Sequence, residues 1–126
     1  MRTARLGRDG PSISRVGIGG FQAGGRGPWG AGPDADDEAA VEAIRAAVDS
    51  GVTWVETAAS YGLGHSEEVV ARALEPWRVG DEVLVFSKCG HPWEPPDRIW
   101  TELAPATIRR QCEESLARLG VERIDL

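Results

Sequence analysis

Cysteine, long apolar runs and excess positive charge are scarce or missing in this sequence, and each absence excludes a class of protein. Two cysteines in 126 residues cannot build a disulfide framework, so we expect a reduced, cytoplasmic protein. The longest apolar runs, such as residues 83–86, have four or five residues, far fewer than the roughly 20 of a membrane span. The net charge is -6, which leaves no general basic face for nucleic acid. We therefore expect neither a membrane nor a nucleic acid as a partner, and the N-terminus shows no apolar segment typical of a secretory signal.

Lysine and tyrosine are nearly missing as well. Of 14 basic residues, 13 are arginine and one is Lys88, and the chain has a single tyrosine, Tyr61. Arginine does not lose its proton at working pH, whereas a lysine can tune a neighbour and be tuned itself. This rarity directs attention to Lys88 and Tyr61, although by itself it carries no functional conclusion.

What is present is typical of one soluble globular domain, residues 1–126, with 41% hydrophobic and 27% charged residues. We expect a hairpin of residues 2–6 and 12–14, long loops at 21–36 and 89–104, and strands at 16–19, 52–57, 82–87 and 122–126. Asp36 is expected to open one helix, Ser66 to cap a second and Pro105 to begin a third. In the third helix we expect an apolar face of Ile108, Cys112, Leu116 and Leu119, with Cys112 in the core.

Strand and helix alternate after the hairpin at about 30 residues per unit, which indicates βα repeats on a parallel sheet. No helix follows the last predicted strand, so one sheet edge and one face stay uncovered. We therefore predict an incomplete α/β fold that can self-associate through its exposed edge.

Three chemically active side chains are predicted at one rim of this sheet. Parallel α/β folds place their chemistry at the carboxyl ends of strands. Glu56 ends one predicted strand, Lys88 follows the next, and Tyr61 lies in the loop after Glu56. A lysine beside a phenol favours its ionised form, and a carboxylate holds the lysine in place, so the phenol can deliver a proton to a carbonyl oxygen. Each residue alone is more often solvated or part of the core, and only the joint placement favours catalysis.

Several segments resemble the aldo-keto reductase family in order and at the expected spacings. Residues 54–68, WVETAASYGLGHSEE, are similar to its signature, in which an Asp-Thr-Ala block precedes Tyr-Gly and then Ser-Glu. Residues 86–90, FSKCG, resemble its Thr-Lys-x-Gly block. Residues 15–21 look like its first strand, and residues 105–126 look like its third main helix and fourth strand. The bacterial branch that includes potassium-channel β-subunit-like proteins is the most similar.

The resemblance implies the N-terminal half of a (β/α)₈ TIM barrel, truncated in strand 4, that reduces a small aldehyde or ketone with NADP(H). Tyr61 would be the catalytic proton donor, with Lys88 and Glu56 as the other catalytic residues. Gly20, Phe21 and Glu56 would contact the cofactor, which supplies the hydride. No metal is implied, and most contacts to the dinucleotide phosphates and adenine would come from later strands.

Two departures from the family pattern matter. Glu56 stands where the family normally has Asp, so the site must accommodate one more methylene. The family's catalytic His falls after the fourth strand, beyond residue 126, and a complete barrel needs about 250 residues. The alternative is therefore a catalytically silent half-barrel that acts only through a partner chain, or a decayed gene product.

Other signals are weaker. Residues 17–22 resemble a dinucleotide-binding loop, but Gln22 replaces the third Gly and a loop follows instead of a helix. Cys89 and His91 lack a further pair of metal ligands. His65 either contacts substrate or helps to cap the helix at Ser66. The tryptophans of the long loops either line a substrate pocket or pack over the rim: Trp29, Trp93 and Trp100.

Overall fold

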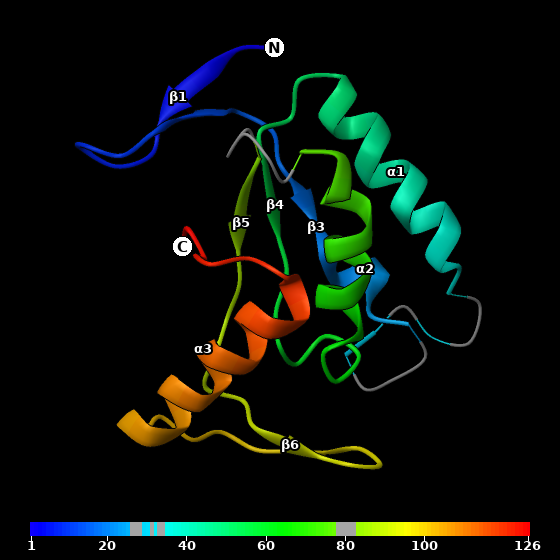
Figure 1. Cartoon of the computed structure of the whole chain (residues 1–126), viewed down its shortest axis with the longest axis vertical. Coiled ribbons are helices and arrows are strands. Elements are labelled where there is room, and N and C mark those ends of the chain that lie inside the picture. The colour runs from blue at the N-terminus through cyan, green and yellow to red at the C-terminus, as the bar shows by residue number, and fades with distance from the viewer. Residues whose placement is uncertain (26–28, 31, 33–34, 78–82) are drawn as a thin grey trace.

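A three-stranded parallel sheet forms the centre of the computed structural model, which describes residues 1–25, 29–30, 32, 35–77 and 83–126 (Figure 1). Its strands are β3 (Ile18–Gly19), β4 (Trp54–Glu56) and β5 (Leu84–Phe86), in the spatial order β3-β4-β5. β4 pairs with both neighbours, so that Glu56 lies opposite Gly19 on one side and Phe86 on the other. The predicted parallel α/β sheet is confirmed, although each strand is shorter than expected and Glu82 of the predicted third strand lies outside the described residues.

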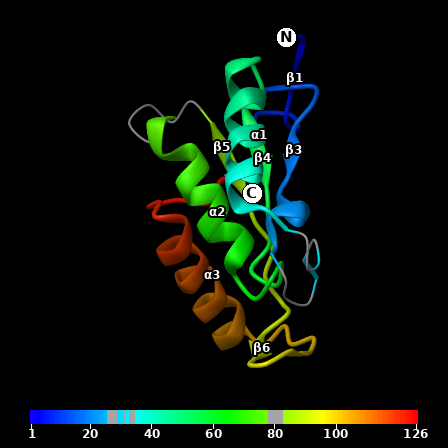
Figure 2. The same ribbon diagram turned by 90° about the vertical axis from the view of Figure 1, so that its right-hand side faces the viewer.

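Two amphipathic helices cover one face of this sheet and build the core. α1 (Asp37–Asp49) and α2 (His65–Leu74) pack against each other, and Figure 2 shows α2 and α3 (Pro105–Leu119) on the same side of the strands. Val55 of β4 and Val70 of α2 have no exposed surface, because apolar side chains of the sheet and both helices interlock there. The side chains that alternate with Val55 along β4 lie on the other face of the sheet.

The start of α1 is as predicted and the start of α2 is not. The Asp36 side chain accepts hydrogen bonds from the backbone of Glu38 and Ala39, at 3.0 and 3.1 Å. In α2 the N-cap is Gly64, in a left-handed conformation with φ of 95°, and no side chain caps it. The prediction that Ser66 caps α2 is therefore wrong. The Ser66 hydroxyl is fully buried and donates instead to a carbonyl of the first βα connection.

α3 (Pro105–Leu119) begins with Pro105 at its first turn, as predicted, but buries a different face. Cys112 is exposed, so its assignment to the core is wrong. Three of its four buried residues carry polar side chains. Thr107 and Gln111 hydrogen-bond to the loop that precedes the helix, and Ser115 accepts from Arg118 of the same helix. The fourth buried residue is Leu119.

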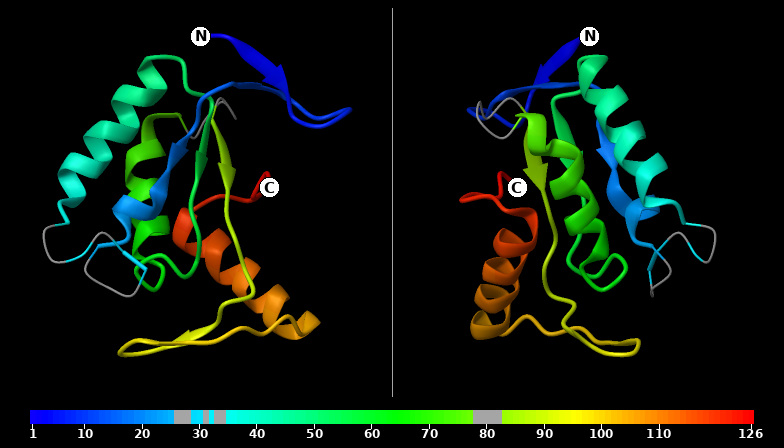
Figure 3. Two further views of the ribbon diagram at one scale, coloured as in Figure 1. Left: turned by 180° about the vertical axis from the view of Figure 1, so that it is seen from behind. Right: turned by 45° about the vertical axis from the view of Figure 1, so that its right-hand side comes forward.

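Two small antiparallel hairpins close opposite ends of the sheet (Figure 3). β1 (Thr3–Arg5) pairs with β2 (Ser12–Ser14) as predicted, and the Ser14 carbonyl accepts a hydrogen bond from the Trp54 indole at 2.9 Å. β6 (Trp93–Glu94) pairs with β7 (Arg98–Ile99) in the predicted loop 89–104, and this second hairpin was not expected. Short 3₁₀ helices, η1 (Gly20–Ala23) and η2 (Glu75–Trp77), follow β3 and α2.

The end of the chain lies along the free edge of β5 without forming the strand predicted at 122–126. The Asp125 amide donates to the Val85 carbonyl and the Ser87 amide donates to the Leu126 carbonyl, both at 2.9 Å. The Asp125 carboxylate also accepts the Val85 N–H at 2.9 Å. This side chain occupies the place of a strand carbonyl, which explains why regular pairing does not form.

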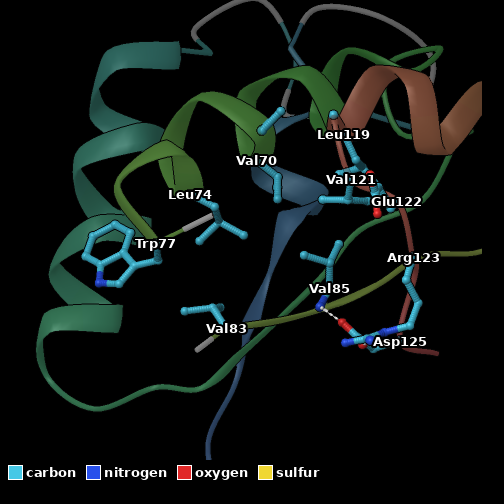
Figure 4. A pocket seen from close by; sticks show the side chains of 12 residues that line it. Val70, Leu74, Trp77, Val83, Val85, Leu119, Val121, Glu122, Arg123 and Asp125 are labelled. Atoms are coloured by element: carbon cyan, nitrogen blue, oxygen red, sulfur yellow. Dashed lines mark hydrogen bonds and ion pairs between the residues drawn. The ribbon is translucent and has the colours of Figure 1, made fainter. Parts of the chain in front are cut away.

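A cavity of about 560 Å³ lies between α2, β5 and the last residues of the chain (Figure 4). Its apolar wall includes Val70, Leu74 and Trp77, and Asp125 lies at its polar side. None of the predicted site residues lines this cavity. In the part of the chain that is described, no helix is long and apolar enough to cross a membrane.

Candidate active site

Glu56 and Lys88 meet at the carboxyl ends of two neighbouring strands. Val55 points into the core below the helices, so Glu56, the next residue of β4, points to the opposite face. Lys88 lies two residues beyond Phe86, the register partner of Glu56, and reaches the same face. Its Nζ forms an ion pair with Glu56 Oε1 and donates a hydrogen bond to the Thr57 carbonyl at 2.8 Å. The predicted pairing of these two residues is confirmed.

Tyr61 joins this pair from the turn between β4 and α2. Its hydroxyl donates to Glu56 Oε1 at 3.5 Å, and Lys88 Nζ lies 4.6 Å from the centre of its ring. The rings of Phe21 and Tyr61 pack in a T-shaped arrangement, with centres 5.3 Å apart and planes at 83°. A cation, an anion and a phenol thus share one small region, as the sequence predicted.

A glycine fixes the turn that carries Tyr61. Gly62 has a positive φ of 58°, which disfavours any residue with a side chain. A Cβ at Gly62 would also overlap the carbonyl of Gly24, in the connection after β3. The backbones of these two loops therefore touch, and the position of Tyr61 depends on that contact.

The three side chains are accessible from solvent. The Lys88 side chain is 49% exposed and that of Glu56 is 32% exposed, so a ligand can reach both. Burial of the rest of the Lys88 side chain lowers its pKa below the ordinary value, because desolvation disfavours the ammonium form. The carboxylate of Glu56 acts in the opposite sense by stabilising that charge.

Gly20 and Phe21, the predicted cofactor contacts, lie beside this group. The Gly20 carbonyl accepts a hydrogen bond from Ser66 Oγ at 2.6 Å, and a Cβ at Gly20 would come within 2.8 Å of the same hydroxyl. Phe21 is 43% exposed, which leaves part of a flat apolar surface open next to Tyr61. An open aromatic surface beside a charged pair suits a planar ring that carries polar substituents, so Phe21, Glu56 and Lys88 fit the nicotinamide end of a dinucleotide. Gly20 itself is buried, and the absence of a Cβ there makes room for Ser66.

The other residues singled out from the sequence make structural contacts. His65 does not cap α2; its Nε2 lies 2.9 Å from Asp37 Oδ1 and ties α2 to α1. Trp29 packs edge-on against His91, with ring centres 5.1 Å apart. The Trp100 indole donates to Glu102 at 3.2 Å. Over the residues that the structure describes, no group of three His, Cys, Asp or Glu side chains could hold a metal ion.

Glu67 is the residue that sequence reasoning missed. It lies in the first turn of α2 and has no exposed surface. Its carboxylate accepts hydrogen bonds at 2.6 Å from Ser87 Oγ and from Arg118 Nε. Arg118 is 51 residues away in the sequence, so no local pattern could have identified this partner.

Comparison with known proteins points to one family. The sequence model of the Aldo/keto reductase family matches residues 15–126. Over 126 residues the chain is 34% identical to aldo-keto reductase YhdN of Bacillus subtilis, covering 100% of this chain and 37% of that protein. It is 33% identical over 135 residues to the NADH-specific methylglyoxal reductase of Escherichia coli, covering 100% of this chain and 40% of the relative.

Solved structures agree with these sequence relatives. The glycerol dehydrogenase of Gluconobacter oxydans superposes with a TM-score of 0.79 and 38% identity, covering 97% of this chain and 37% of the other. An aldo-keto reductase from Klebsiella pneumoniae in complex with NADPH gives a TM-score of 0.71 and 28% identity, covering 98% and 37%. The chain thus spans about two fifths of the length of the relatives that it matches, and its sheet and helices correspond to part of a (β/α)₈ barrel.

Proposed function

This chain belongs to the aldo/keto reductase family, and we propose that it supplies the proton-donating part of a nicotinamide-dependent carbonyl reductase. The observation that carries the proposal is the contact of Tyr61 with both Glu56 and Lys88 at the carboxyl ends of the strands. The proposed substrate is a small aldehyde or ketone, and the proposed product is its alcohol.

In this proposal each side chain has a separate task. Tyr61 is the proton donor, because its hydroxyl is the only phenol of the chain and stands at an accessible edge of the site. Lys88 lies over its ring as a cation and stabilises the phenolate that remains after the proton has left. Glu56 holds Lys88 by the ion pair and accepts from the Tyr61 hydroxyl, which fixes both groups before substrate binds.

The cofactor in this proposal is NADP(H), which supplies the hydride when it is bound. Phe21 offers its exposed ring and Glu56 a polar contact at the nicotinamide end. Gly20, which is buried, contributes by holding the chain before Phe21 against Ser66. The relative crystallised with NADPH supports this choice, whereas the relative named as NADH-specific makes it testable. The proposal includes a cytoplasmic location, in keeping with the two free cysteines, Cys89 and Cys112.

A chimera tests the function directly. Residues 1–126 would replace the matching part of the Bacillus subtilis relative, whose remaining chain completes the barrel. We expect the folded chimera to oxidise NADPH with 4-nitrobenzaldehyde, followed by the loss of absorbance of the reduced nicotinamide, and to prefer NADPH over NADH. Tyr61→Phe should reduce this rate by about 100-fold or more, because it removes a general acid.

The unmodified relative is the positive control, and the 126-residue chain alone is expected to give no turnover above background. Circular dichroism and thermal melting would establish that each protein is folded. A folded chimera with no turnover, or one whose rate is unchanged by Tyr61→Phe, would contradict the proposed function.

A second candidate is a silent chain that acts through another copy. Ile108 and Leu116 of α3 are half-buried, and Cys112 between them is exposed. The apolar surface left open along this row favours self-association. Sedimentation velocity over a concentration series tests it: we expect a dimer that Leu116→Glu weakens, and a monomer at every concentration would rule this candidate out.

A further inference from the structure

A buried ion pair joins α2 to α3 directly behind the candidate active site. Glu67 has no exposed side-chain surface and Arg118 has 18%, and their contact is 2.6 Å. A charge that is buried to this degree is costly unless it is paired and hydrogen-bonded, and the carboxylate of Glu67 has two donors at 2.6 Å. The fold therefore supplies the partners that the buried carboxylate of Glu67 requires.

The second donor to Glu67 is Ser87, the residue immediately before Lys88. Side chains of consecutive residues in an extended segment point to opposite faces. The Ser87 hydroxyl points towards the helices, where Glu67 Oε1 accepts it, so the Lys88 side chain is directed to the site. Glu67 thus holds the backbone from which Lys88 extends.

α3 also holds the chain after Lys88. The buried side chain of Gln111 accepts the Gly90 amide through its Oε1 at 2.7 Å. Lys88 therefore lies between two points of attachment, one at Ser87 through Glu67 and one at Gly90 through Gln111. Both attachments depend on the docking of α3, because Arg118 and Gln111 belong to that helix.

The same arginine touches the turn that carries Tyr61. Arg118 lies so close to Gly64 that a Cβ at Gly64 would come within 2.8 Å of Arg118 Cδ. Gly64 closes the turn that begins after Tyr61 and starts α2. One side chain of α3 thus contacts the segments that position both Lys88, through Glu67, and Tyr61.

From these contacts we propose that Glu67 and Arg118 are positioning residues, which set the place of Lys88 over Tyr61 through Ser87 and the Gly64 turn. The assignment of a catalytic task to Lys88 rests on the proposed function, but the positioning itself does not. It is a property of the folded chain that can be measured without turnover. Neither residue touches the reacting groups, so their effect is exerted through the backbone.

The single lysine makes the experiment specific. Trace acetylation with acetic anhydride labels only two amines in this chain, Lys88 and the α-amine of Met1, so the second serves as an internal standard. The labelling rate of an amine follows its neutral fraction, which partial burial raises for Lys88. Ser87→Ala, Glu67→Gln and Arg118→Met should each expose Lys88 further to solvent, which raises its pKa and lowers its neutral fraction. A rise of about half a unit in this pKa would slow the labelling of Lys88 relative to Met1 about threefold near neutral pH.

Exposed neighbours provide matched controls. Glu68→Gln alters the next residue of α2, and Arg109→Met removes an exposed arginine of α3. Both should leave the labelling ratio unchanged. Ser87→Ala removes one hydrogen bond and leaves the ion pair intact. It therefore tests whether Glu67 positions Lys88 even where the variants of Glu67 or Arg118 do not fold.

A merely structural role predicts a different result. In that case the folded variants would melt at a lower temperature than the unmodified chain. Their labelling ratio, and the pH profile of Lys88 labelling, would be the same as in the unmodified chain. That outcome, in folded Ser87→Ala above all, would overturn the proposal. Failure of the proposed function would appear separately, as a chimera without turnover, while Lys88 of the 126-residue chain still responds to these substitutions.

Discussion

The single lysine of the chain, Lys88, lies over the ring of its single tyrosine, Tyr61, with Nζ 4.6 Å from the ring centre. The two residues are 27 positions apart and come from different loops. Glu56 connects them, because its Oε1 contacts both the ammonium and the phenol. This arrangement gives the site a proton donor, a cation and an anion whose substitution effects can be measured one at a time.

Shortening Glu56 tests whether the site needs the extra methylene. In the chimera, Glu56→Asp should keep or raise the rate of carbonyl reduction, since the family normally has Asp at this position. Glu56→Gln is the matched control, because it keeps the length and removes the charge that holds Lys88. A loss of about 100-fold for Glu56→Asp, the size expected for a misplacement of about 1 Å, would mean that the site has adapted to Glu.

Lys88 should make the stability of the chain rise with pH in the alkaline range. Burial lowers the pKa of Lys88 in the folded chain below its ordinary value of 10.5. Between the lowered pKa and 10.5 the unfolded chain binds more protons, so the free energy of unfolding increases with pH across that window. Urea midpoints of the unmodified chain and of Lys88→Met should diverge there, with only the unmodified chain rising. Parallel profiles would contradict this expectation.

Gly62 should be intolerant of substitution for two separable reasons. Gly62→Ala places a Cβ in a left-handed conformation and against the Gly24 carbonyl. Gly7 has a similar φ of 67° but open space around a Cβ, so Gly7→Ala isolates the backbone cost, about 1–2 kcal/mol. We expect Gly62→Ala to lower the free energy of unfolding by more than Gly7→Ala, as measured by urea denaturation. Equal losses would show that the contact between the two loops has no effect.

Glu102 should contribute stability that is lost in acid. Hydrogen bonds from Thr107 and Trp100 lower the pKa of its carboxyl group below the ordinary value of 4.5. A group of this kind stabilises the folded chain above 4.5, and its contribution disappears as the pH falls through the lowered pKa. Glu102→Gln should therefore flatten the decrease of the urea midpoint in this acid range, with Glu113→Gln, an exposed glutamate of α3, as the control. An unchanged slope in Glu102→Gln would contradict the prediction.

The sequence predicted the site better than it predicted the helix that supports it. Alternating side chains and parallel order were enough to bring Glu56 and Lys88 to one rim, because these rules depend only on chain geometry. The buried face of α3 was predicted wrongly, since Gln111 is buried where it accepts the Gly90 amide and Ser115 where it accepts from Arg118. A hydrophobic pattern identifies a core face only when burial is driven by apolar contact.

By itself the sequence determined the parallel α/β order, the N-terminal hairpin, the starts of α1 and α3, and the three residues at the rim. Each follows from local preferences or from a period of two or 3.6 residues, which the chain carries at every position. Tertiary structure alone decided that Ser66 bonds to Gly20 instead of capping α2, that Asp125 occupies the edge of β5, and that Glu67 meets Arg118 behind Lys88. Those contacts join residues 40 to 51 positions apart, and their energy depends on burial and distance, which only the folded chain defines.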